Sequence, residues 1–171
     1  MLEEYQADAA YKKEVSEGDE AALLLSVFYH DIVYQPDRND NEEQSVHLLE
    51  RFIGKAQSLS NLKLEEISRR ACQLILMTKQ HKPQDHLEYI LNDLDMSVLA
   101  APSARYELYS GQIKQEYIRM FANELEFNEK RAKFLSSLDP KTVFYLHPGH
   151  EETCRRNIEW EMAKLNVRSE L

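Results

Sequence analysis

An apolar run from Ala21 to Tyr29 is followed at once by His30 and Asp31, two residue types that commonly ligate metals. A charged side chain is seldom buried without a partner. An aspartate at the end of a run that is apolar on every side therefore predicts a cation or several donors beside it. Because consecutive helical residues point about 100° apart, we expect both side chains to reach one divalent ion. A core histidine next to a satisfied aspartate at a helix terminus is the alternative.

A second pair of acids, Asp93 and Asp95, lies in a later segment that is otherwise rich in leucine and isoleucine. Residues two apart on a helix point about 200° apart, so the two carboxylates cannot face the same site. Asp95 shares the apolar stripe with Leu91 and Val98, whereas Asp93 is expected toward the polar side. We therefore predict Asp95 as the metal ligand. A helix cap or an intrahelical pair is the alternative.

The composition predicts an all-α protein with one domain over residues 1–171. Gly and Pro are sparse, at 4 and 5 residues, while Leu, Glu, Lys and Ala are abundant. The apolar spacing predicts a bundle of seven or eight helices. These are expected over 2–15, 20–34, about 62–81 and about 150–166, with others after Asp40, after Pro83, across Tyr106 to Phe121, and before Pro140. Gly18 and Asp19 are expected to cap the helix over 20–34.

The charge and cysteine content exclude several classes of partner. A formal net charge of -9 without a basic stripe disfavours nucleic acid duplexes and anionic membranes. The longest apolar run is too short to span a bilayer. The two cysteines, Cys72 and Cys154, form no Cys-x-x-Cys pair, which is typical of a reducing compartment. We expect a soluble, cytoplasmic protein.

The order of several short motifs is more specific than any one of them. They are Phe28 to Tyr34, then Asn41-Glu42 with Ser45, Thr78 to His81, Asp93 to Asp95, Tyr106, Tyr109, Glu116 and Tyr117, and finally Arg131, Glu151, Arg155 and Asn157. In this order and spacing, which cover nearly the whole chain, the sequence resembles a bacterial group of predicted metal-dependent phosphohydrolases in the HD-domain superfamily.

The resemblance implies an all-helical HD-like domain, a divalent metal, and hydrolysis of a phosphate ester or nucleotide. It implies that His30, Asp31 and Asp95 are metal ligands. The metal expected from imidazole and carboxylate ligands is Mn, Fe, Co, Ni or Zn, with Mg as a further candidate. The family's first metal-binding histidine has no counterpart before His30 in this sequence. Either the chain starts at an internal methionine or it is a degenerate member.

The remaining polar residues of these motifs are candidates for catalytic roles. Asp93 or Glu42 would accept a proton, and Lys79 or Arg131 would offset the charge of a phosphoryl group. His81, which is expected to end the helix over 62–81, would complete the site, contact a phosphate or cap that helix. The other histidines, His47, His86, His147 and His150, are expected to be exposed or structural.

Two hypotheses from other functional classes stay open. In one, a catalytically degenerate HD-like module binds a nucleotide or phosphate, or scaffolds a partner protein. In the other, the chain is a plain helical interaction protein without a metal. Metal content of the purified protein distinguishes the enzyme from both.

Overall fold

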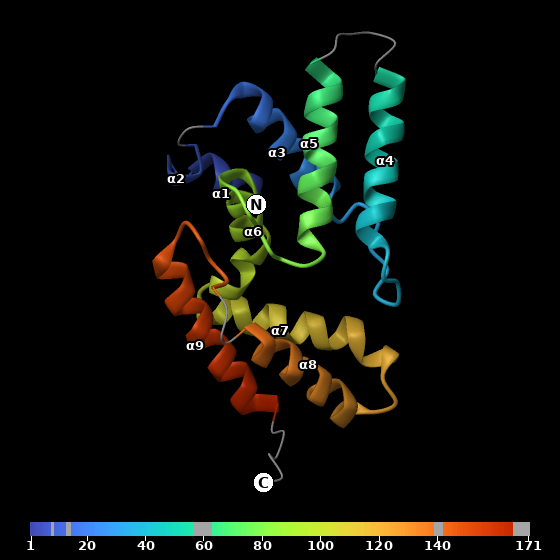
Figure 1. The fold of residues 1–171 in the computed structure, drawn as a ribbon. Helices are drawn as coiled ribbons and strands as arrows, with labels where there is room; N and C mark the ends of the chain where they lie inside the picture. Colours follow the sequence, from blue (N-terminus) through green and yellow to red (C-terminus); the bar gives the residue numbers. More distant parts are fainter. Residues whose placement is uncertain (8, 13–14, 57–62, 139–141, 166–171) are drawn as a thin grey trace. The chain divides into compact units, whose positions relative to one another are not determined.

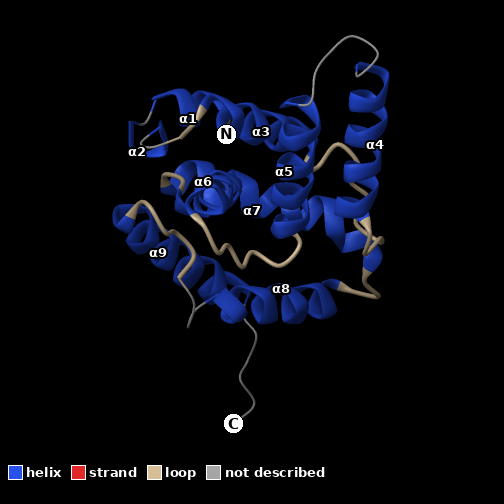
Figure 2. Cartoon of the chain, turned by 45° about the horizontal axis from the view of Figure 1, so that its top comes forward, coloured by secondary structure: helices blue, strands red, loops and turns tan. Residues whose placement is uncertain are grey.

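The computed structural model describes residues 1–7, 9–12, 15–56, 63–138 and 142–165, and these residues form helices and loops without a strand (Figure 1, Figure 2). The predicted all-α class is thereby confirmed. The chain divides into two compact units, Met1–Asp95 and Met96–Leu171. Among the described helices, none combines the length and apolar character needed to cross a membrane.

The first unit is organised around one central helix. Its elements are α1 (Leu2–Ala7), α2 (Ala9–Lys12), α3 (Glu17–Tyr29), α4 (Asn41–Ala56), α5 (Lys63–Thr78) and α6 (His86–Asp95). Helix α5 contacts α3, α4 and α6, and Figure 1 shows α4 and α5 side by side. Its buried side chains Leu74 and Ile75 pack in a core that also contains Leu23, Leu49 and Leu91. Burial of this apolar face positions the ends of α3, α5 and α6.

Helix α3 begins and ends earlier than the sequence suggests. Its N-cap is Ser16, whose hydroxyl accepts the Asp19 N–H at 3.1 Å, so the expected cap at Gly18 and Asp19 is wrong. The helix ends at Tyr29 rather than at residue 34, and His30 is its C-cap. Phe28 is 63% exposed, so the helix is not buried on every side although its sequence is apolar there.

The second unit contains η2 (Met96–Ala100), α7 (Ser103–Tyr117), η3 (Ile118–Met120), α8 (Glu124–Leu138) and α9 (Pro148–Leu165). Helix α9 packs on η2, α7 and α8. Leu99, Tyr106, Leu135, Phe144 and Ile158 are members of its buried cluster. Pro140 and residue 166, which the sequence places at helix ends, lie outside the described residues.

A buried ion pair joins three helices of the second unit. Glu161 of α9 accepts hydrogen bonds from Tyr106 Oη of α7 at 2.5 Å and from Arg131 of α8 at 2.8 and 3.1 Å. Burial alone would raise the pKa of Glu161, but the hydrogen bonds and charge of Arg131 outweigh burial and hold the pKa below its ordinary value. The carboxylate is therefore ionised and fully partnered inside the unit.

Removing the charge of Glu161 should destabilise the second unit strongly. In Glu161→Gln the buried guanidinium of Arg131 loses its counter-charge, which costs about 3 kcal/mol. The matched change Glu107→Gln breaks an exposed pair with Lys164 and should cost less than about 1 kcal/mol. Urea unfolding followed by circular dichroism measures both. Equal losses would contradict a stabilising role specific to the buried pair.

The stability difference between wild type and Glu161→Gln should depend on pH in a defined direction. Because the folded-state pKa of Glu161 is lowered, its ionic stabilisation is fully present above the unfolded-state pKa of about 4.3 and is lost as the pH falls through the folded value. The stability difference between wild type and Glu161→Gln should therefore narrow in urea titrations performed from pH 6 down to pH 3. A difference that stays constant over this range would exclude the proposed linkage.

Candidate functional site

The first unit brings together three of the predicted metal ligands. His30 Nε2 lies 3.4 Å from Asp95 Oδ1 and 3.5 Å from Asp31 Oδ2. His30 follows α3 directly and Asp95 is the last residue of α6. Both carboxylates therefore meet the same ring nitrogen, and we call His30, Asp31 and Asp95 the His30 cluster.

The ring of His30 is held in one orientation. Its Nδ1 lies 3.0 Å from the Val27 carbonyl oxygen, and a carbonyl can only accept, so Nδ1 carries the proton of this hydrogen bond. Nε2 is thus the atom that faces the carboxylates. Burial alone would lower the pKa of His30, but the hydrogen bond to Asp95 and the charges of Asp95 and Asp31 raise the pKa to about 8.

The distances within the His30 cluster resemble those between ligands of a shared cation. Two donors about 2.1 Å from a tetrahedral ion lie about 3.4 Å apart, whereas a direct hydrogen bond between a cationic nitrogen and a carboxylate is about 2.7–2.9 Å. Within the described part of the chain, however, no group of three or more His, Cys, Asp or Glu side chains is arranged to hold a metal ion as it stands. A complete ligand set would need one of these side chains to rotate.

Asp31 is the member of the cluster with room to rotate. It lies in the turn after α3, not on the helix as expected, and its side chain is 57% exposed. The inference that Asp31 is a buried charge is therefore wrong. Partial burial nevertheless raises its pKa, the charges of Asp95 and Glu42 raise it further, and His30 and His81 oppose the rise.

The two acids of α6 point in different directions, as helix geometry requires. Neither of them, however, is the solvent-facing acid that the sequence predicted. The Asp95 carboxylate faces His30 Nε2. Asp93 is fully buried, so its expected place on a polar face is wrong. Its neighbours Asn92 and Leu94 are buried too, because α6 is enclosed around most of its circumference.

His81 also faces Asp95, from the loop between α5 and α6. Helix α5 ends at Thr78, so His81 lies three residues beyond the helix that it was expected to end. Its Nδ1 is 3.3 Å from Asn92 Oδ1, and its Nε2 is 3.9 Å from Asp95 Oδ2. Asn92 was not singled out in the sequence. The sequence feature that could have drawn attention to Asn92 is an amide placed directly after the apolar pair Ile90 and Leu91.

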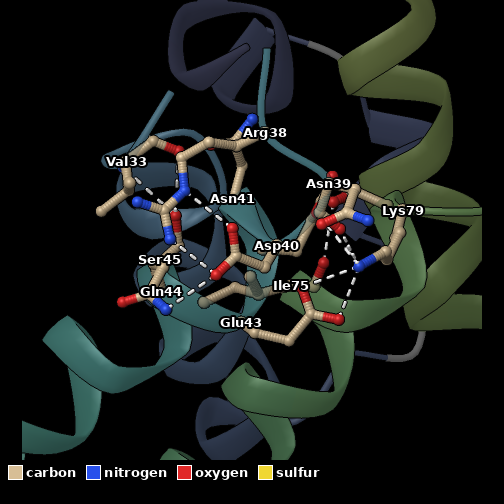
Figure 3. A network of polar contacts seen from close by, with 12 residues as sticks. Val33, Arg38, Asn39, Asp40, Asn41, Glu43, Gln44, Ser45, Ile75 and Lys79 are labelled. Carbon is tan, nitrogen blue, oxygen red and sulfur yellow. Dashed lines mark hydrogen bonds and ion pairs between the residues drawn. The ribbon is translucent and has the colours of Figure 1, made fainter. Parts of the chain in front are cut away.

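Lys79 and Glu42 lie where α4 begins beside the end of α5. Lys79 Nζ contacts both Glu43 carboxylate oxygens, at 2.6 and 2.8 Å, and donates to the Asn39 carbonyl at 2.5 Å (Figure 3). Glu42 is more distant from the same ammonium group, at 3.9 Å. The positive charge of Lys79 is thus already engaged by acids of α4.

The loop that carries Asp31 is tied to the start of α4. The buried Ser45 hydroxyl accepts the Val33 N–H at 3.2 Å, and Asn41 accepts the Gln35 N–H at 3.1 Å. Arg38 and Gln44 both donate to the Asp40 carboxylate (Figure 3). These hydrogen bonds restrain the loop between His30 and α4.

The motif residues of the second unit have structural partners. Arg131 pairs with Glu161, as described above. Glu151 accepts the Val143 and Phe144 N–H groups, both at 2.9 Å, and pairs with Arg155. Asn157 donates to the carbonyls of Leu99 and Ala101, both at 2.8 Å. These residues connect η2, α8 and α9 and their loops, so Arg131 is not included in the candidate site.

Comparison with protein-family models, with curated proteins and with solved structures found no match for this chain. The resemblance of the motifs to HD-domain phosphohydrolases stays a prediction.

Removal of the Ser45 hydroxyl should loosen the loop that carries Asp31. In Ser45→Ala the Val33 N–H loses its acceptor, which costs about 1–2 kcal/mol locally. Amide hydrogen exchange should then accelerate across residues 31–35 while α5 stays protected. Ser137→Ala, which removes an exposed hydroxyl bonded within its own helix, is the control. Unchanged exchange in residues 31–35 would show that Ser45 does not restrain the loop.

Proposed function

We propose that the His30 cluster binds a divalent metal and that the protein is a metal-dependent phosphohydrolase of the HD-domain type, acting on a phosphate ester or nucleotide. The observation that supports this proposal is the position of His30 Nε2 within 3.5 Å of both Asp31 and Asp95. Its Nδ1 is committed to the Val27 carbonyl. Metal-ligating histidines typically donate their second ring N–H to such an acceptor.

The donor set fits the chemistry of several ions. One imidazole and two carboxylates suit Mn, Fe, Co, Ni or Zn, and Mg also accepts carboxylates. His30 and Asp95 would hold the ion, and Asp31 would join by rotation of its exposed side chain. When bound, such an ion supplies Lewis-acid activation of water and of a phosphoryl oxygen.

Glu42 is the better of the two predicted proton acceptors. A general base must reach the proton that it removes. Asp93 is fully buried within α6, whereas the Glu42 side chain is partly exposed and its charge acts on Asp31. We therefore assign the proton-accepting role to Glu42. Lys79 would release the Glu43 carboxylate and bind a phosphoryl group in its place.

An exposed apolar surface favours a second candidate, a non-catalytic interaction module. Phe28 and Ile32 flank the His30 cluster in sequence, and both are more than half exposed. Phe52 of α4 is also more than half exposed and lies against the Tyr29 ring. Exposed apolar side chains that gather into a patch often mark protein contacts.

Asp95→Asn and Asp93→Asn should separate a metal ligand from a structural acid. Loss of a ligating carboxylate should weaken Mn²⁺ or Co²⁺ binding by on the order of 100-fold or more, and loss of an outer carboxylate by about 10-fold. Calorimetric titration measures the affinities. Hydrolysis of p-nitrophenyl phosphate and a nucleotide panel should decline in the same order, with circular dichroism as the folding control.

Other results would contradict the proposal in different ways. Equal losses in the two variants would mean that Asp95 has no special role. If the wild-type protein binds neither ion and turns over none of the panel, the phosphohydrolase proposal is wrong and the interaction module is favoured.

A further inference from the structure

His81 has a backbone conformation that is uncommon for a residue other than glycine. Its φ is 48°, in the left-handed region that residues other than glycine seldom occupy. Among the described residues, it is the one non-glycine residue with positive φ. Such a conformation costs free energy and is often found at functional sites. The conformation directs the chain from α5 into the loop that precedes α6.

The side chain of His81 is not needed to cap α5. The backbone N–H groups of Gln80 and His81 both donate to the Met77 carbonyl at 3.1 Å, which satisfies this carbonyl at the helix end. The imidazole instead contacts α6 through Asn92 and Asp95. The alternative that His81 is a C-terminal cap thus leaves its ring contacts unexplained.

Asn92 determines which nitrogen of His81 carries the proton. Asn92 is 1% exposed, and its Oδ1 lies 3.3 Å from His81 Nδ1. An amide oxygen can only accept, so Nδ1 must donate and the neutral ring keeps its lone pair on Nε2. Nε2 is the nitrogen on the Asp95 side, 3.9 Å from Oδ2.

The two imidazoles are therefore arranged in the same way around Asp95. His30 and His81 each have Nδ1 anchored to an oxygen acceptor, the Val27 carbonyl in one case and Asn92 in the other. Each presents Nε2 to a different oxygen of the Asp95 carboxylate. Metal-ligating histidines typically donate one ring N–H to an acceptor of this kind, which leaves the other ring nitrogen to face the ion.

We propose that His81 is a second imidazole ligand of the metal site and that Asn92 is the positioning residue that holds it in the ligating tautomer. This inference rests on the proposed function, because it assumes that the His30 cluster binds a divalent ion. It adds a fourth ligand to His30, Asp31 and Asp95, and it gives the buried amide of α6 a role.

The tautomer of His81 can be measured without any metal. Two-bond ¹H–¹⁵N correlation spectra of ¹⁵N-labelled protein, recorded where His81 is neutral, should show the proton on Nδ1. Asn92→Asp keeps an oxygen acceptor in place and should preserve this tautomer. Asn92→Leu removes the acceptor and should shift the population toward Nε2–H. A wild-type ring protonated on Nε2 would overturn the role of Asn92, because the amide would then be donating.

Metal affinity tests the ligand role. Titration with Co²⁺ followed by its visible absorption reports both the affinity and the coordination. His81→Gln should weaken Co²⁺ binding by on the order of 100-fold and alter the spectrum, and Asn92→Leu should weaken it by about 10-fold. Asn92→Asp should bind at least as well as wild type. The matched control is His86→Gln, at the exposed first residue of α6, which should leave binding unchanged.

The outcomes separate this inference from the proposed function. If wild type binds Co²⁺, Asp95→Asn does not, and His81→Gln binds like wild type, then His81 is not a ligand while the metal site stands. If wild type does not bind Co²⁺, the metal site is wrong and the ligand role of His81 is wrong with it. Thermal unfolding of each variant excludes global unfolding as the cause of a loss.

Discussion

Two carboxylates that face one imidazole nitrogen require a positive charge between them. The lone pair of an unprotonated His30 Nε2 would be repelled by Asp31 and Asp95, both within 3.5 Å. A proton satisfies this arrangement, in accord with the pKa of His30 raised to about 8, and a divalent ion satisfies it equally. The two cations would compete for the same atoms, so a bound metal would take the place of the proton on His30 Nε2.

This geometry depends on where α3 ends. The last carbonyls of a helix lack intrahelical partners, and the Val27 carbonyl is one of them because α3 stops at Tyr29. It is therefore available to His30 Nδ1, which turns Nε2 to the acids. The same early end releases Asp31 into a turn, and the hydrogen bond from Val33 to Ser45 holds the following loop on α4.

The sequence predicted the helices and the meeting of His30 with Asp95 from apolar spacing and ligand chemistry. It did not predict the end of α3, because Ile32, Val33 and Tyr34 continue the apolar pattern, and the stop depends on a tertiary bond to Ser45. It also placed Asp93 toward solvent, because a helix pattern does not reveal how many faces are covered. Asn92 was overlooked because its contact is with the ring of His81, which lies across the loop and is not revealed by the helix pattern.

The two basic residues predicted to contact phosphate, Lys79 and Arg131, are both paired with carboxylates in this chain. The chain has 30 acidic against 21 basic residues, so its lysines and arginines have an excess of carboxylates to pair with. Lys79 forms an ion pair with Glu43 and Arg131 forms one with Glu161, so the charge of each is already balanced by a carboxylate. Before Lys79 could release Glu43 and contact an anionic substrate, that substrate would need local positive charge at the His30 cluster. The proposed metal is the component that would supply it, which makes metal binding the first property to establish.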